Sequence, residues 1–499
     1  MGKWLLGAAL GALVIAAAPA RAQTLQIAVD QSPVGLDPHI ATAFSSTLIT
    51  SAIYEGLTAI DAELHVVPAL AESWTVSADG KTYLFKLRAG ARFHDGSPVT
   101  PADVIASLAR VRDVKTGSPY ASRFAGVVSL EGVGSDGVRI VLNAPSAPFL
   151  AQLASVAIIP AAALGGGADL ARHPDGTGPF KFREWVPNTL IALDRNENYW
   201  ANGLPKLAGL RFNIVPEAAT RQLGLTGGTY QLLPNIDAAT AAQLANTPGV
   251  KVQSTDDLAY SLIGLNAAKP PFDKAEVREA LEYAINRPQL VQAAYLGKAV
   301  PAGPLSPALK DWALPVSAFP CYTPNLERAK ALLRQAGITL PLKVTMNVLG
   351  SVQQVVDVAQ VVQAQAKAAG IEFTLNVQEA GRFIQDWRAG NFEAFASLNS
   401  GGVDPDDYFG RTFQTGGATN VFKYSNPKLD ALLTEARQTM DQAKRKTLYD
   451  EAQKILACTG PVVHLAYGTL FSAQRDALQG FTLNPTRSLR GLREAALAP

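Results

Sequence analysis

The chain has 499 residues, 48% hydrophobic and 17% charged, a composition typical of a globular protein large enough for more than one domain. Removal of a predicted leader that contains Lys3 and Arg21 lowers the 44 basic residues to 42, which equals the 42 acidic residues. A mature chain of about zero net charge, with no basic stripe or polybasic segment, is not expected to bind nucleic acid or a membrane surface.

The N-terminus has the pattern of a secretory signal peptide over residues 1–22. Lys3 provides the positive start, an apolar run follows, and Ala20-Arg21-Ala22 is a cleavage site of the A-x-A kind. Because no cysteine lies at this site, attachment of a lipid is not expected. These features predict a mature protein that begins at Gln23 and is released into a Gram-negative periplasm, not a lipoprotein.

The first part of the mature chain contains strand patterns and one well-marked helix start. Apolar and polar residues alternate over 25–29, 83–87 and 138–142, which predicts half-buried strands. Thr100 precedes Pro101, and Asp103 stands three residues beyond Thr100. This is the pattern of a capped helix N-terminus, so a helix is predicted from Pro101 onward.

From Asp273 the pattern changes to alternating helices and strands. Strands are predicted over 342–348, 371–377 and 392–398, and a helix over 352–369 separates the first two. That helix is interrupted by glutamines and charged residues, so it is not a membrane span. The strand-helix-strand order predicts an α/β lobe.

Several short motifs follow one another along the mature chain. They are Glu72-Ser73-Trp74, Tyr83-x-Phe85-x-Leu87-Arg88, Phe93-His94-Asp95-Gly96, Gly176-Thr177-Gly178-Pro179-Phe180-Lys181, Arg195-Asn196-x-x-Tyr199-Trp200 and Ala329-Lys330-x-Leu332-Leu333-x-x-Ala336-Gly337. Together they resemble the signature of the family 5 extracellular solute-binding proteins. Members of that family are periplasmic receptors of ABC importers for peptides, nickel and related solutes.

The resemblance implies an α/β protein with the two-lobed type II fold of periplasmic binding proteins and an inserted β-rich domain. The expected parts are a signal peptide (1–22), lobe I part a (23–55), the inserted β-rich domain of lobe I (56–165), lobe I part b (166–264), the α/β domain of lobe II (265–467) and the C-terminal part of lobe I (468–499). It also implies a monomer that binds its solute between the lobes. The permease subunits of an inner-membrane ABC transporter are the expected protein partners.

Motifs for catalysis or cofactor binding are weak. Residues 132–137 spell GxGxxG, but a strand is predicted to follow them, so a hairpin turn is favoured over a dinucleotide site. The five histidines are far apart in sequence, and no serine lies in a GxSxG elbow. We therefore expect no cofactor, no metal and no catalytic residue. An exported hydrolase that uses scattered carboxylates is the alternative.

The segment from Asn399 to Tyr408 is the strongest candidate for ligand contacts. It follows a predicted buried strand, and its glycines expose backbone amides beside polar side chains, although a plain Asp-Pro turn is the alternative. The resemblance to peptide-binding relatives implies a carboxylate for the peptide's amino terminus where Gly401 stands. Recognition of a free amino terminus is therefore in doubt unless Asp404 or Asp407 substitutes. The predicted contacts are Asn399, Ser400, Gly401, Gly402, Asp404 and Asp407.

Four aromatic residues and two cysteines complete the predicted site and its support. The aromatic candidates for the cleft are Phe44, Tyr260, Phe383 and Trp387, each equally compatible with a place in the core. Cys321 and Cys458 are compatible with one disulfide in an oxidising compartment and equally with two buried thiols.

Taken together, the residues and the resemblance predict a receptor that captures a peptide-like or other small polar solute and delivers it to a permease. An opine, a glycoside or a metal chelate is the alternative ligand. A periplasmic sensor or another binding protein outside transport is the alternative within non-enzymes.

Overall fold

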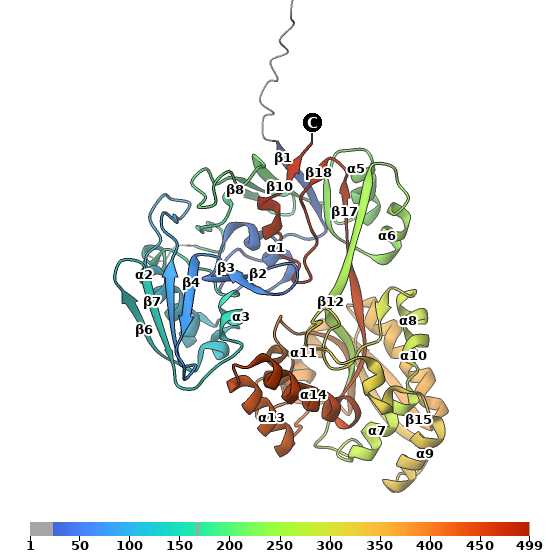
Figure 1. Ribbon diagram of the computed structural model, residues 1–499. Helices are drawn as coiled ribbons and strands as arrows, with labels where there is room; N and C mark the ends of the chain where they lie inside the picture. Colours follow the sequence, from blue (N-terminus) through green and yellow to red (C-terminus); the bar gives the residue numbers. More distant parts are fainter. Residues whose placement is uncertain (1–22, 166–168, 499) are drawn as a thin grey trace, which may run out of the picture.

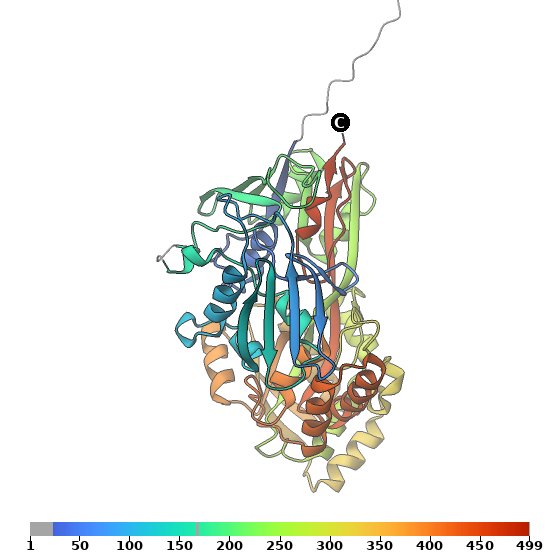
Figure 2. The ribbon, with the colours of Figure 1, turned by 60° about the vertical axis from the view of Figure 1, so that its left-hand side comes forward.

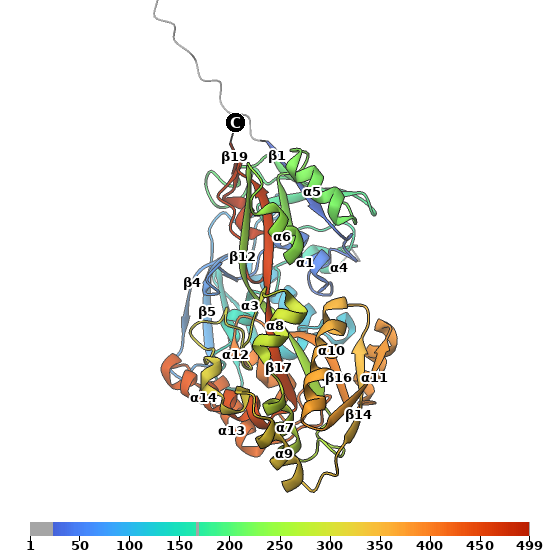
Figure 3. The ribbon, with the colours of Figure 1, turned by 90° about the vertical axis from the view of Figure 1, so that its right-hand side faces the viewer.

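Two lobes share one mixed sheet of 11 strands in the computed structural model, which describes residues 23–165 and 169–498. Two long strands, β12 (Val250–Leu265) and β17 (Val462–Arg475), run from one lobe into the other (Figure 1, Figure 3). The predicted signal peptide lies outside the described residues. Among the residues described, no helix combines the length and the apolar character that a membrane span requires.

The first lobe carries the sheet order β17-β11-β1-β10-β9-β8. Leu25 and Ile27 of β1 are fully buried, as the alternation over 25–29 predicts, and β1 pairs in parallel with β10. The short β18 and β19 near the C-terminus also pack here, so the tail returns to the lobe that contains the start of the mature chain. The other elements of this lobe are β1 (Thr24–Val29), α1 (Phe44–Ile53), β8 (Phe180–Val186), β9 (Leu190–Arg195), β10 (Gly209–Ile214), α5 (Ala218–Thr226), β11 (Leu232–Ile236), α6 (Ala238–Leu244), β18 (Leu478–Gln479) and β19 (Ala496–Leu497).

A β-rich domain with its own hydrophobic core is inserted into the first lobe (Figure 2). Its four-stranded antiparallel sheet has the order β4-β5-β7-β6. The helix predicted after Thr100 begins at Pro101, and the Asp103 carboxylate accepts a hydrogen bond from the Thr100 amide (2.8 Å). The GxGxxG segment forms the turn between β6 and β7, as predicted. The elements are β2 (Thr58–Ile60), β3 (Val66–Pro68), β4 (Ala71–Val76), β5 (Thr82–Leu87), α2 (Pro101–Arg112), η2 (Ala121–Phe124), β6 (Val127–Val133), β7 (Gly137–Leu142), α3 (Phe149–Leu153) and α4 (Ala161–Gly165).

The second lobe has the sheet order β15-β14-β16-β12, and β14 pairs in parallel with both neighbours. Because β14, α10 and β15 follow one another, the predicted strand-helix-strand unit is present. The lobe's elements are α7 (Ala275–Ala284), α8 (Arg287–Tyr295), β13 (Ala299–Val300), α9 (Leu326–Gln335), β14 (Leu342–Leu349), α10 (Gln353–Ala368), β15 (Ile371–Gln378), α11 (Ala380–Ala389), β16 (Ala394–Ser400), α12 (Pro405–Phe413), α13 (Pro427–Gln438) and α14 (Gln442–Thr459).

A disulfide joins Cys321 to Cys458 across the second lobe. Cys321 lies in the short helix η4 (Pro320–Tyr322), and Cys458 lies in the last turn of α14. The bond ties the loop between α8 and α9 to the longest helix of this lobe. The residue boundaries predicted for the separate parts of the chain stay predictions, since β12 and β17 belong to both lobes.

Candidate ligand-binding cleft

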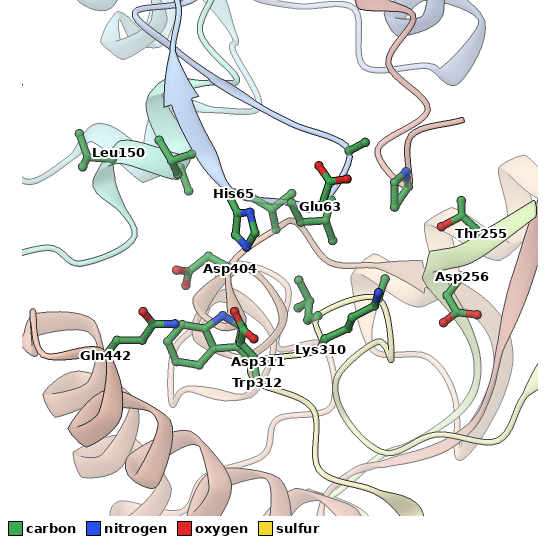
Figure 4. A pocket seen from close by; sticks show the side chains of 18 of the residues that line it. Glu63, His65, Leu150, Thr255, Asp256, Lys310, Asp311, Trp312, Asp404 and Gln442 are labelled. Atoms are coloured by element: carbon green, nitrogen blue, oxygen red, sulfur yellow. The ribbon is translucent and has the colours of Figure 1, made fainter. Parts of the chain in front are cut away.

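A cavity of about 870 Å³ lies between the two lobes. The turn between β2 and β3 forms its upper wall in Figure 4, where Glu63 and His65 face Trp312 and Gln442 of the second lobe. The two crossing strands form another side through Asp256 and neighbouring residues. A volume of this size falls in the range of small-molecule and short-peptide sites.

A second cavity of about 320 Å³ lies beside the first. Ala151 and Val403 line both cavities, so the two are adjacent along the interface between the lobes. Hydroxyl groups and two ion pairs line the second cavity. Arg490 of the C-terminal tail lies 3.3 Å from Glu55, and Arg123 lies 3.3 Å from Asp407. This combination of hydrogen-bonding groups and apolar walls suits a small polar solute.

The crossing point of the strands lies directly beside the larger cavity. The pairing of β12 with β17 is regular up to Asp256, shifts register before Tyr260, and then continues in the second lobe. Groups from both lobes hold the irregular stretch: Arg487 lies 2.6 Å from the Asp257 carboxylate, and the Ser306 hydroxyl donates to the Asp257 carbonyl (2.7 Å). An interruption of the ladder at this place is suited to a hinge.

On the side opposite the crossing, the inserted domain contacts the second lobe directly. The Ala147 amide donates to the Arg437 carbonyl (2.8 Å). Arg123 of η2 lies 3.3 Å from the Asp407 carboxylate of α12, and both side chains are mostly buried. The cavity is thus bounded by the crossing strands on one side and by contacts between the lobes on the other.

The two glycines of the Asn399–Tyr408 segment are required by close packing. A Cβ on Gly401 would lie 2.1 Å from the Tyr408 ring, and a Cβ on Gly402 would lie 2.1 Å from the Asp407 carboxylate. The Tyr408 hydroxyl donates to the Leu258 carbonyl at the crossing (3.0 Å), which fixes the ring below the glycines. No side chain, and hence no carboxylate, fits at position 401 in this arrangement.

The three aspartates of this segment are each paired with an arginine. Asp404 accepts two hydrogen bonds of 2.7 Å from Arg445 and also caps α12 through the Asp406 amide. Asp406 lies 3.0 Å from Arg437, and burial raises the pKa of Asp406 to about 6. Asp407 lies beside Arg123, and burial raises its pKa as well. These carboxylates therefore hold the segment and the two lobes in place.

Only part of the predicted site lies on the two cavities. Gly402 and Asp407 line the second cavity, and Asp404 lines the first. Asn399 donates to the Tyr260 hydroxyl (3.2 Å), and the Ser400 hydroxyl donates to the Gly401 carbonyl (3.1 Å), so both side chains are engaged at the end of β16.

The interpretation of the aromatic candidates as cleft residues needs correction. Tyr260 and Phe383 are 1% and 5% exposed and belong to the core of the second lobe, and Trp387 packs against that core. Phe44 is 57% exposed, but it lines a separate small cavity where the Arg487 guanidinium lies 4.4 Å from its ring centre. Tyr260 packs against Tyr408 and Tyr467, and Phe383 packs against Phe395, so both rings belong to the aromatic core of the second lobe.

Three cleft residues were not recognised from the sequence. Trp312 lines the larger cavity and packs edge-on against Tyr449 of α14. Arg123 and Asp256 approach the cleft from segments far apart in the chain. Aspartate is uncommon in strands, so Asp256 within a long strand could have been recognised from the sequence as a candidate binding residue. Nothing in the sequence around Arg123 or Trp312 indicates a place in the cleft.

No cluster suited to a metal ion occurs within the described ranges. His39 and His464 are buried and His94 is half-buried, each apart from the others. Burial lowers the pKa of His39 and His94 to about 4 and that of His464 to about 3. His39 donates from Nε2 to the Ala157 carbonyl (2.8 Å), while its Nδ1 accepts from Arg110 (3.0 Å). The contacts of His39 are those of a structural histidine.

Residues 65–420 match the family model described as bacterial extracellular solute-binding proteins, family 5 Middle. The glutathione-binding protein GsiB of Pectobacterium atrosepticum is 30% identical over 504 residues, which cover 97% of this chain and 96% of the relative. The ABC transporter substrate-binding protein CtaP of Listeria monocytogenes is 25% identical, with a TM-score of 0.86 and coverage of 96% and 100%. The oligopeptide-binding protein AppA of Bacillus subtilis, solved with a nonapeptide, is 26% identical, with a TM-score of 0.81 and the same coverage.

The chain belongs to the family 5 extracellular solute-binding proteins. The expected two-lobed type II fold is confirmed by the similarity to these structures. The expected function as a solute-binding protein of the ABC-transporter kind is confirmed at that level.

Proposed function

We propose that the protein binds a peptide-like solute in the cleft between its lobes and delivers it to the permease of an ABC importer. The observation that carries this proposal is the pair of adjacent cavities, of about 870 and 320 Å³, between the lobes. The glutathione-binding protein GsiB and the oligopeptide-binding protein AppA, solved with a nonapeptide, support this class of ligand. The signal-peptide pattern of residues 1–22 supports a periplasmic location without a lipid anchor, and a monomer is the proposed state.

Closure of the lobes provides the mechanism. A solute that contacts both lobes binds the closed form more tightly than the open form, so it shifts the population toward closure. The register shift between Asp256 and Tyr260 is the proposed hinge, and the contact between Arg123 and Asp407 forms only when the lobes meet. The closed form is then the one that the permease receives.

Solute binding without chemical turnover is part of the proposal. A hydrolase needs a carboxylate that is free to transfer a proton to or from the substrate. Of the carboxylates that line the two cavities, Glu55, Asp404 and Asp407 are held by arginines. Among the described residues, Glu63, Asp256 and Asp311 are not, so the support for binding without turnover comes from the relatives, which are binding proteins. Asp404 in addition caps α12, so its movement would disturb the helix.

Native mass spectrometry of the mature protein, purified from periplasmic extract without denaturation, tests this function. The expected spectrum contains a mass increment that matches a peptide or peptide-like solute, and titration of that solute into stripped protein raises the unfolding temperature. A binding protein that serves as a sensor and not in transport would bind the solute but fail to support its uptake in cells that carry the proposed ABC permease. Conversion of the bound solute into products would favour the hydrolase alternative.

A further inference from the structure

A peptide-like solute brings a cationic amino group into the cleft, and that group needs a counter-charge. An unpaired charge in a closed cleft costs several kcal/mol. The aspartates of the Asn399–Tyr408 segment do not supply a free carboxylate, because Arg445, Arg437 and Arg123 already hold them. Position 401 has no room for one. The counter-charge must therefore come from another element.

Among the described residues that line the larger cavity, Asp256 is the partly buried carboxylate that no arginine holds. It lies on β12 immediately before the register shift and lines the larger cavity (Figure 4). Its side chain is partly buried, and within the described part of the chain its carboxylate has no ion pair within 4.0 Å and accepts no hydrogen bond. Burial raises the pKa of Asp256, and the charge of Lys310 offsets part of this effect. A cation bound beside this carboxylate would stabilise its charged form.

The other charged groups that line the larger cavity also favour a positively charged ligand group. Arg445 and Asp404 neutralise each other. Among the remaining groups, Glu63, Asp256 and Asp311 are acidic and Lys310 is basic, so the lining attracts a cation. Glu63 and Asp311 are exposed at the rim, whereas Asp256 is partly buried at the crossing strands.

We propose that Asp256 binds the primary ammonium group of the solute and thereby determines specificity for ligands with a free amine. This inference rests on the proposed function, since it assigns one contact within the same cleft. Trp312 lies across the cavity on the second lobe, so a ligand held at Asp256 extends between the lobes. The same contact would place ligand charge directly at the hinge, where it favours closure.

A competing role for Asp256 is an ion pair with Lys310 that forms on closure. The two roles predict different behaviour of the variant Lys310→Ala. If Asp256 binds the ligand's amine, removal of Lys310 removes a competing cation and leaves the affinity equal or higher. If Asp256 instead pairs with Lys310, the variants Lys310→Ala and Asp256→Asn weaken binding alike.

Isothermal titration calorimetry with glutathione, trialanine and N-acetyl-trialanine tests the assignment. Glutathione and trialanine have a free amino group, and the wild-type protein is expected to bind at least one of them. If it binds trialanine, it is expected to bind N-acetyl-trialanine at least about tenfold more weakly. Asp256→Asn is expected to weaken binding of the free amine at least about tenfold, while the rim variant Asp311→Asn changes it less than about threefold. Asp256→Asn removes an unpaired charge, so its unfolding temperature without ligand is expected to stay the same or rise.

Equal affinity of wild type and Asp256→Asn for a bound free amine would overturn this assignment and leave the proposed function standing. An equal loss of binding affinity in Asp256→Asn and Lys310→Ala would likewise overturn the assignment and leave the proposed function standing. Absence of binding of all three probes to the wild-type protein would count against both the assignment and the peptide-like ligand on which it rests.

Discussion

Gly401 and Gly402 show how single residues shape this site. Their missing side chains allow the Tyr408 ring and the Asp407 carboxylate to pack directly beneath the loop. Tyr408 in turn reaches the Leu258 carbonyl at the crossing of the lobes. The glycines therefore connect the geometry of the cleft wall with the proposed hinge, and they exclude a carboxylate at position 401.

Substitution Gly401→Ala is expected to destabilise the protein by about 1 to 3 kcal/mol, because the new methyl group overlaps the Tyr408 ring. Gly468→Ala is the matched control, since a Cβ there meets no atom within 4 Å. Urea unfolding of both variants measures the difference. Equal stability of Gly401→Ala and wild type would contradict the packing described for the loop.

His39 is expected to make the protein less stable in mild acid. Its pKa is about 4 in the folded protein against an ordinary 6.5, because burial disfavours the charged ring. The unfolded chain thus binds a proton at this histidine more readily than the folded protein does. The contribution of neutral His39 to the free energy of unfolding is therefore fully present above pH 6.5 and is lost as the pH falls toward 4. The loss amounts to up to about 3 kcal/mol.

Unfolding free energies measured between pH 7 and pH 4 check this prediction. His39→Gln is expected to have a flatter pH dependence than wild type, and His65→Gln, at an exposed position, controls for the substitution itself. A wild-type slope that persists unchanged in His39→Gln would show that other groups cause the acid sensitivity.

At the scale of elements, the cleft depends on β12, β17, η2 and α12. The two strands connect the lobes, while η2 and the start of α12 meet on the far side of the cavity. Arg123 and Asp407 thus come from separate lobes, and their side chains are 26% and 11% exposed. An ion pair so placed affects the balance between open and closed forms more than the stability of either lobe.

Arg123→Ala is expected to weaken solute binding about tenfold, because closure then buries the Asp407 charge without its partner. The double variant Arg123→Ala with Asp407→Asn is expected to recover part of that loss, since it removes the unpaired charge. Arg139→Ala, which breaks an exposed ion pair inside the inserted domain, is the control. Calorimetric titration of one bound solute gives the four affinities. A double variant weaker than Arg123→Ala would contradict the role assigned to the pair.

For the whole molecule, local patterns predicted the elements better than the site. The cap that Thr100 and Asp103 form at the start of α2 and the strand-helix-strand order that begins at residue 342 depend on neighbours in sequence, so they could be predicted. The cleft instead brings together Glu63, Asp256 and Trp312 from distant segments. Tyr260 and Phe383 were misplaced because an aromatic residue has the same local pattern whether it faces a cleft or the core.

Small-angle X-ray scattering of the mature protein, stripped of co-purified solute, tests most directly whether a solute closes the two lobes. Glutathione, tripeptides, opines, glycosides and metal chelates are added in turn, and binding is established independently by calorimetry. The radius of gyration is expected to fall with a solute that binds and to stay constant with one that does not. A solute that binds tightly without changing the radius of gyration, or a panel in which none binds, would contradict closure around a small polar ligand.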